Sequence, residues 1–164
     1  MPDKHPKSQV VVRFQDCDAF GHLNNARYID YFLNARDDHL RAYYQFDLVQ
    51  HAHTQRANWV VTHHEIAYLR PALPGETVTI RTALIDVTDG RLKVEGLMFD
   101  EAEQVLKAAL WTTFRYVDLA SGRPARHPAE VMDWLRGIAV DEDVREGTIE
   151  ARIRQIKAGR ATPA

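Results

Sequence analysis

The residues best suited to chemistry lie together in one short polar stretch, DCDAFGHLNN, at positions 16–25. The stretch offers a carboxylate at Asp18, an imidazole at His22, an amide at Asn25 and a glycine at position 21. A positioned carboxylate can attack a carbonyl carbon or activate water, and a glycine lets the backbone approach a ligand closely. The combination is compatible with acyl transfer, although an Asp-rich turn before a helix is more often only a turn and a cap.

This chemistry needs a helix directly behind the polar stretch. Apolar residues recur at helical spacing from Ile29 to Tyr44, and neither glycine nor proline interrupts residues 26–46. We therefore predict one long helix there, with Asn24 or Asn25 as its N-cap. The first N–H groups of a helix lack internal partners and carry the positive end of its dipole, so they can stabilise an oxyanion.

The rest of the chain is predicted to form mainly strands. Apolar and polar residues alternate, and the Asp-Gly pair at 89–90 is a strong hairpin signal. We expect a loop holding His51 and His53 after the long helix, a short helix over 127–138, and a second, charged helix within 140–159. The predicted strands are 9–14, 57–69, 77–87, 91–99 and 104–119.

This order of elements predicts one α+β domain in which an antiparallel sheet curls around one long central helix. The chain has 164 residues, which suits a single domain. We place that domain at residues 9–138, after a polar segment at 1–8. Residues 139–164 form a charged, partly helical extension, and we expect its helix to pack on a partner subunit.

Composition argues against several classes of function. The formal net charge of −2 gives no bulk electrostatic case for binding nucleic acid or an anionic membrane. No apolar run is long enough to span a bilayer. The single cysteine, Cys17, excludes an intramolecular disulfide and fits a reducing compartment, so we predict a cytoplasmic protein.

The stretch RFQDCDAFGHLNNARYIDYF, residues 13–32, resembles the signature of hot-dog-fold thioesterases of the 4-hydroxybenzoyl-CoA thioesterase type. That signature runs R-x-x-D-x-D-x-x-G-H-x-N-N-x-x-Y, and the GHLNN variant also resembles acyl-ACP thioesterases. A looser likeness in EIAYLRPALPGETVTI and LASGRPARHPAEV extends it over about residues 9–136. The signature residues present are Arg13, Asp16, Asp18, Gly21, His22, Asn24, Asn25 and Tyr28.

The resemblance implies a hot-dog fold and hydrolysis of an acyl-CoA thioester to the free acid and CoA, with acyl-carrier protein as the alternative carrier. It implies that Asp18 is the catalytic carboxylate, as nucleophile or general base, and that the amide at Asn25 polarises the thioester carbonyl. It also implies a homodimer with the active site at the subunit interface, paired into tetramers in many members. Neither a metal nor another cofactor is expected.

Other residues are expected to assist. Gly21, Asn24 and Tyr28 should shape the substrate site. His22 either positions the substrate or a water, tunes the catalytic carboxylate, or bonds only within its own turn. Arg70, at the end of a predicted strand before PALPG, is the best candidate for binding CoA phosphates. The available cations are Arg70, Arg81, Arg91, Lys93 and Arg115.

Three features of the sequence favour a structural interpretation over a chemical one. Asp16 is expected to stabilise the loop, together with Arg13. Cys17 is expected to be structural, because alternate side chains of an extended segment point to opposite sides and no consistent triad follows. His63 and His64 are adjacent on a predicted strand and face opposite ways, so they cannot easily share a metal ion.

Two alternatives to this site stay open. Some hot-dog thioesterases carry their acid on the central helix, where Asp30, Asp37 and Asp38 are candidates, although these positions are more typical of a solvated helix face. The other alternative is a non-catalytic acyl-CoA-binding protein that keeps the fold. Tight binding of a CoA ester without product release would favour it.

Overall fold

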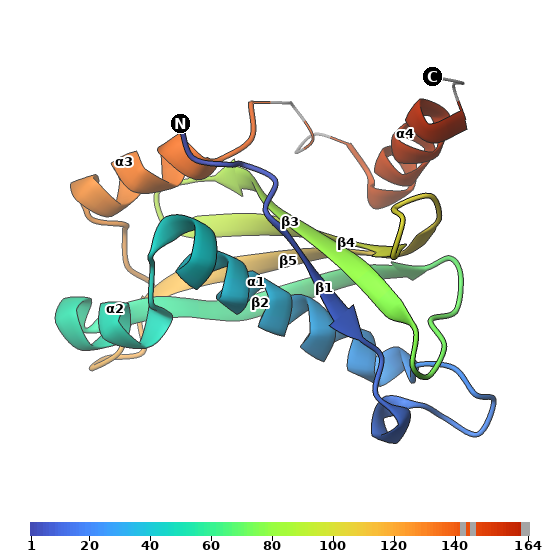
Figure 1. The fold of residues 1–164 in the computed structure, drawn as a ribbon. Coiled ribbons are helices and arrows are strands. Elements are labelled where there is room, and N and C mark those ends of the chain that lie inside the picture. Colours follow the sequence, from blue (N-terminus) through green and yellow to red (C-terminus); the bar gives the residue numbers. More distant parts are fainter. Residues whose placement is uncertain (142–143, 145–146, 162–164) are drawn as a thin grey trace.

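The structure is a computed structural model that describes residues 1–141, 144 and 147–161. In these residues, five strands form one antiparallel sheet in the order β1-β3-β4-β5-β2, so that β1 and β2 lie at its two edges (Figure 1). β3, β4 and β5 follow one another as a meander, as the alternating pattern predicts. The strands are β1 (Lys7–Val11), β2 (Ala57–Tyr68), β3 (Thr77–Val87), β4 (Arg91–Asp100) and β5 (Leu106–Asp118).

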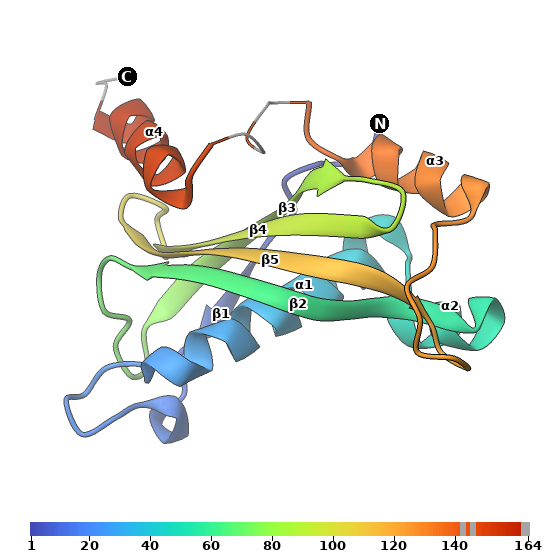
Figure 2. The same ribbon diagram turned by 180° about the vertical axis from the view of Figure 1, so that it is seen from behind.

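The helix α1 (Tyr28–Tyr44) lies against one face of the curled sheet, as both ribbon views show (Figures 1 and 2). This arrangement confirms the predicted α+β class and the sheet that curls around one long helix. A Cβ atom at Gly96 in β4 would lie 2.6 Å from Cδ1 of Phe32, so the glycine allows the close approach of helix and sheet. The core between them includes Tyr28, Phe32, Ala35, Val78, Ile80, Met98, Ala108 and Leu110.

The long helix is shorter than the predicted span 26–46, because its start and end are fixed by specific caps. A 3₁₀ turn, Asn25–Arg27, precedes α1, and the side chain of Asn24 caps that turn by accepting from the backbone N–H of Ala26 at 3.0 Å. At the other end Gln45 adopts a left-handed conformation with φ of 50°, which ends the helix.

Two predictions for the N-terminal half of the chain were wrong in detail. The first strand occupies Lys7–Val11 and not 9–14, because Phe14–Asp16 turn into a 3₁₀ segment. The expected loop with His51 and His53 is instead a helix, α2 (Leu48–Gln55). Asp47 starts this helix by accepting from the N–H groups of the second and third residues that follow it, at 2.8 and 3.0 Å.

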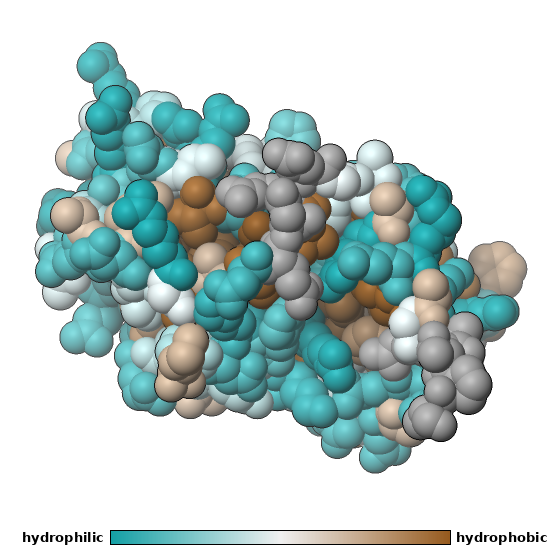
Figure 3. Space-filling model, turned by 90° about the horizontal axis from the view of Figure 1, so that it is seen from above, coloured by the Kyte–Doolittle hydropathy of each residue, from teal (hydrophilic) through white to brown (hydrophobic). Residues whose placement is uncertain are grey.

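The C-terminal region adds the helices α3 (Ala129–Ile138) and α4 (Ile149–Ala161). The apolar side of α4 packs through Ile149 and Ile153 on the sheet face opposite α1, next to Trp111. The apolar side of α4 is therefore covered by its own chain, and packing of this helix on a partner subunit stays a prediction. The view from above shows hydrophobic residues gathered in the hollow between α3 and α4 (Figure 3). No described helix is long and apolar enough to cross a membrane.

Candidate active site

The loop that carries Asp18 is a tight turn closed by its own backbone. The N–H of Asp18 donates to the carbonyl of His22 at 2.9 Å, and Gly21 adopts a φ of 73°, which favours glycine. Oδ1 of the Asp18 carboxylate accepts from the N–H of Phe20 at 2.9 Å. Its second oxygen, Oδ2, makes no hydrogen bond within the described part of the chain. The loop therefore holds the half-exposed carboxylate in place and leaves one oxygen available to a ligand.

The start of the helical segment lies directly behind this loop and presents an unused donor. The side chain and carbonyl of Asn24 accept from Ala26 and Arg27, at 3.0 and 2.8 Å. The backbone N–H of Asn25 makes no hydrogen bond among residues 1–141, 144 and 147–161. Because it lies at the positive end of the helix dipole, this N–H is suited to stabilise an oxyanion.

A pair of side chains ties the loop to the helix. The hydroxyl of Tyr31 donates to Oδ2 of Asp16 at 2.6 Å and accepts from the backbone N–H of Arg13 at 3.0 Å. Burial is the main reason that the pKa of Tyr31 is raised, so the hydroxyl stays protonated. Asp16 thus holds the loop as expected, but Arg13 takes part through its backbone and Tyr31 supplies the link.

The segment after β2 forms the wall beside this loop. The carbonyl of Ala72 accepts from the N–H of Leu23 at 2.8 Å, and the N–H of Ala72 donates to the hydroxyl of Tyr28 at 3.1 Å. Tyr28 is only 2% exposed, so it supports the wall from inside. The hydroxyl of Tyr68 donates to the carbonyl of Asn25 at 2.8 Å, which joins the end of β2 to the helix start.

Three other side chains named from the sequence, those of Arg70, His22 and Cys17, make no contact in the described chain that gives them a catalytic role. Arg70 is exposed and lies in the segment after β2, which runs beside the Asp18 loop. Within the described residues, no hydrogen bond joins its side chain to the predicted site. The side chain of His22 is exposed, and its backbone N–H lies 3.4 Å from Oδ1 of Asp18. Burial and the neighbouring Asp16 and Asp18 raise the pKa of the Cys17 thiol, which disfavours a thiolate nucleophile.

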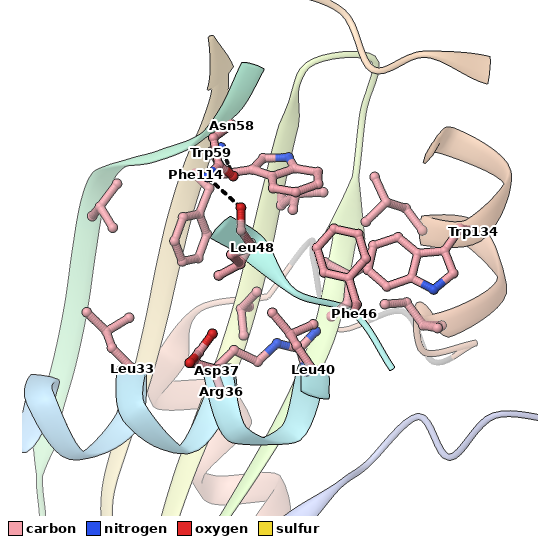
Figure 4. Close-up of a pocket in the computed structure, with 16 residues that line it drawn as sticks. Leu33, Arg36, Asp37, Leu40, Phe46, Leu48, Asn58, Trp59, Phe114 and Trp134 are labelled. Carbon is pink, nitrogen blue, oxygen red and sulfur yellow. Dashed lines mark hydrogen bonds between the residues drawn. The ribbon is translucent and has the colours of Figure 1, made fainter. Parts of the chain in front are cut away.

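A second region lies along the C-terminal half of α1, where the structure forms a cavity of about 260 Å³ (Figure 4). Its walls come from α1, α3, the segment around α2 and the inner faces of β2 to β5. The rings of Phe46 and Trp134 stack at one side, with centroids 4.3 Å apart. Arg36 and Asp37 of α1 also line this cavity, which is otherwise almost entirely apolar.

A third region is a hollow near the turn between β3 and β4, lined by four arginines. Asp89 is the one carboxylate among the described residues that line this hollow. The Nε atom of Arg115 is buried and has no hydrogen-bond partner in the described part of the chain. The hollow is therefore strongly positive and suited to an anion. Its arginines are Arg91, Arg115, Arg126 and Arg136.

The titratable side chains suggest no metal centre. In the part of the chain that the structure describes, no group of three or more His, Cys, Asp or Glu side chains is placed to hold a metal ion. His63 lies at a shift in the register between β2 and β5, and His64 bonds through Nδ1 to the hydroxyl of Thr112 at 3.0 Å. The carboxylate at Asp18 and the helix start therefore stand out as the chemical groups.

The comparison with protein families shows the class of reaction to which this chain belongs. Residues 12–135 match the model of the thioesterase-like superfamily. The chain belongs to the thioesterase-like superfamily. It is a thioester hydrolase, and the predicted resemblance to thioesterases is confirmed.

Similar proteins agree with this assignment. The long-chain acyl-CoA thioesterase FadM of Escherichia coli (strain K12) is 27% identical over 129 residues, which cover 79% of this chain and 96% of FadM. The probable thioesterase YbaW from Escherichia coli has 26% identity and a TM-score of 0.71, over 82% of this chain and 98% of that chain. A thioesterase from Thermus thermophilus, solved with coenzyme A and Zn, has 28% identity and a TM-score of 0.67, over 80% and 92% of the chains. These neighbours confirm the hot-dog fold.

Sequence reasoning on this thioesterase found the loop but missed the cavity and most of the arginine hollow. The signal for the cavity was present in the helix: Phe32, Arg36 and Leu40 follow one another at four-residue spacing, so a charged residue interrupts the apolar stripe. For the hollow, Arg91 and Arg115 were named as available cations. Their convergence with α3 depends on the tertiary fold, which the spacing of residues does not give.

Proposed function

We propose that this thioesterase hydrolyses acyl-CoA thioesters and that Asp18 is its catalytic carboxylate. The observation that carries the proposal is that a carboxylate oxygen and a backbone N–H, both without hydrogen-bond partners in the described chain, lie in the same region. Oδ2 of Asp18 and the N–H of Asn25 both lack partners in the described chain, and both lie at the start of the helical segment. FadM, which is similar to this chain, is a long-chain acyl-CoA thioesterase, and that supports CoA as the carrier.

In the proposed reaction the carboxylate acts on the thioester carbon. Asp18 either attacks the carbon directly, giving an acyl-enzyme anhydride that water then hydrolyses, or it removes a proton from the water that attacks. In both versions the carbonyl oxygen becomes an oxyanion, the C–S bond breaks and CoA leaves as the thiolate. The N–H of Asn25 stabilises the oxyanion, and one such donor is typically worth about 2.7–4 kcal/mol in the transition state.

We propose a homodimer formed through β2. This strand is twelve residues long and lies at the sheet edge, where Val60, Val61 and Tyr68 are exposed. Long exposed edge strands with apolar side chains favour pairing with another strand. The proposal pairs β2 with β2 of a second copy in antiparallel orientation, which continues the sheet and places both α1 helices on the same face.

This dimer would bring the Asp18 loop of one copy to the cavity of the other. Within one chain, the contact between Tyr68 and Asn25 ties the end of β2 to the helix start. The amide of Asn58 donates to the carbonyl of Leu48 at 3.2 Å, so the beginning of β2 lies beyond the helix end. A two-fold axis near the middle of β2 therefore places the start of one α1 beside the second half of the other. The cavity would then hold the acyl group.

Two places are proposed for the phosphates of CoA. Arg70 lies in the segment that flanks the Asp18 loop, and it stays the best of the five candidates predicted from sequence. The hollow around Arg115 and Arg126 offers more positive charge, and guanidinium groups match phosphate oxygens well. Acyl-carrier protein stays the alternative carrier. The cytoplasmic location stays a prediction from the single cysteine, Cys17.

The test is hydrolysis of a panel of acyl-CoAs by the wild type and by Asp18→Asn. The release of the CoA thiol measures the rate. We expect kcat to fall by about 10²–10⁴-fold, which is the usual range for a general base. Asp30→Asn is the matched control, since Asp30 is exposed at the start of α1 and tests the alternative acid on the helix. Unchanged turnover in Asp18→Asn would remove Asp18 from the mechanism.

A single turnover in ¹⁸O-labelled water separates the two roles of the carboxylate. Label in the Asp18 side chain would exclude a pure general-base path. Tight binding of acyl-CoA by the wild type without release of thiol would instead support the non-catalytic alternative.

A further inference from the structure

We propose that the cavity along α1 selects acyl groups that end in a carboxylate and that Arg36 is the residue that recognises this end. The inference rests on the proposed function, because it takes the cavity as the place of the acyl group. It adds a substrate class and a specificity-determining residue.

The cavity has an open side and a closed side. Val61, on the edge strand, is 42% exposed, and the side chain of Asp37 is 38% exposed, so the cavity opens between α1 and β2. The opposite wall contains Leu84, Leu135 and Ile138, which are at most 2% exposed. An acyl chain that enters beside the edge strand would therefore end among buried side chains.

The size of the cavity limits the chain that fits. A dry cavity of about 150 Å³ accepts a benzene ring, and this cavity measures about 260 Å³. It can therefore hold a substituted ring or a chain of medium length. Its apolar walls suit methylene groups, which leaves Arg36 as the polar group in the buried part of the lining (Figure 4).

Arg36 is a buried cation without a carboxylate partner among the described residues. It is 8% exposed, and Nη1 donates to the hydroxyl of Thr82 at 3.1 Å. Its guanidinium carbon lies 5.9 Å from the centre of the Tyr44 ring. Among residues 1–141, 144 and 147–161, it forms no ion pair. A guanidinium has five donors, and a buried charge is costly unless an opposite charge compensates it.

The other titratable groups nearby form no ion pair with Arg36 among the described residues. The Asp3 carboxylate acts electrostatically on His39 and Tyr44 but forms no ion pair with the guanidinium in the described part of the chain. His39 bonds through Nδ1 to the hydroxyl of Thr82 at 2.8 Å. Burial and, to a smaller extent, Arg36 lower the pKa of His39 to about 4, so this imidazole is neutral near pH 7. At the open side, Asp37 is paired with Arg41, whose Nε lies 3.1 Å from Oδ2. A ligand carboxylate that reached Arg36 would therefore meet a guanidinium that no carboxylate of the described residues pairs with.

The experiment compares two CoA esters of equal chain length, octanoyl-CoA and 7-carboxyheptanoyl-CoA, on the wild type and on Arg36→Met. We expect the wild type to favour the carboxylated ester at least tenfold in kcat/KM. In Arg36→Met the ratio of the two kcat/KM values should fall at least tenfold, and Arg36→Lys should keep part of the preference. Arg154→Met, on an exposed position of α4, is the control and should keep the wild-type ratio.

A binding measurement makes the inference independent of turnover and of the folding of any one variant. We expect free octanedioate to raise the Tm of the wild type more than octanoate does at the same concentration, and Arg36→Met to lose that difference. Equal kcat/KM for the two esters together with equal Tm shifts would overturn the inference. If the wild type hydrolyses neither ester, the proposed function fails, and the Tm comparison still decides the role of Arg36.

Discussion

The two ends of α1 are built in opposite ways. At its start, Asp18, Gly21 and Asn24 are held by hydrogen bonds within a ten-residue stretch. Along its second half, the cavity is assembled from helices and strands that lie up to about a hundred residues apart in the chain. In the proposed function, the first end carries the groups for chemistry and the second carries the groups that select the acyl chain. The proposed chemistry is then encoded locally in the chain, whereas the proposed specificity depends on tertiary packing.

The largest effect on stability is expected in the second half of α1, at His39, and concerns pH. Burial lowers the pKa of His39 from its ordinary 6.5 to about 4. The unfolded chain therefore binds a proton at a higher pH than the folded chain, and stability is lost as pH falls from about 6.5 toward 4. At full protonation this one group corresponds to about 3 kcal/mol. Urea unfolding between pH 7 and 4 measures the loss, and His39→Asn should make the slope shallower.

An exposed histidine provides the control for that slope. His53→Asn makes the same substitution at an exposed position of α2 and is the matched control. Burial also lowers the pKa of His51, His64 and His127, so part of the slope should persist in His39→Asn. A slope that does not change in His39→Asn would show that the burial of His39 does not cause the loss of stability at low pH.

A smaller effect is expected at the Asp18 end, from its cap. Asn24→Ala removes the acceptor for the N–H of Ala26 and should cost about 1 kcal/mol of unfolding free energy. It should also lower kcat, because the cap orients the N–H of Asn25. Asn34→Ala makes the same change at an exposed site within α1 and serves as the control. If both variants lose equal activity, the cap does not position the oxyanion donor.

The smallest effect is expected from the arginine hollow, which belongs to neither end. Arg126→Gln should raise the KM for an acyl-CoA several-fold and leave kcat unchanged, and added salt should reduce the difference. The corresponding acyl-pantetheine, which lacks the nucleotide phosphates, should not distinguish the variant from the wild type. Arg123→Gln, on the same loop but outside the hollow, is the control. A rise in KM in Arg70→Gln but not in Arg126→Gln would assign the phosphates to Arg70.

The contrast between locally held residues and residues brought together by tertiary packing explains what the sequence could predict. The strand periods, the long helix and the Asp18 loop are each set by contiguous residues, so pattern and turn chemistry were sufficient to find them. α2 was missed because it is only eight residues long and its main signal is one cap, Asp47. Arg36 and His39 were overlooked because a helical stripe was expected to be apolar, whereas both are buried through contacts with Thr82 on a distant strand.

The contact between α4 and the sheet has a consequence for handling the protein. Glu95 is only 2% exposed, and its carboxylate accepts from Arg152 at 3.0 Å and from the indole N–H of Trp111 at 3.0 Å. A chain that ended before α4 would expose this carboxylate together with the apolar side chains that Ile149 and Ile153 now cover. Such a chain should expose a hydrophobic patch and aggregate on expression. The last helix therefore keeps this face of the sheet from contact with other molecules.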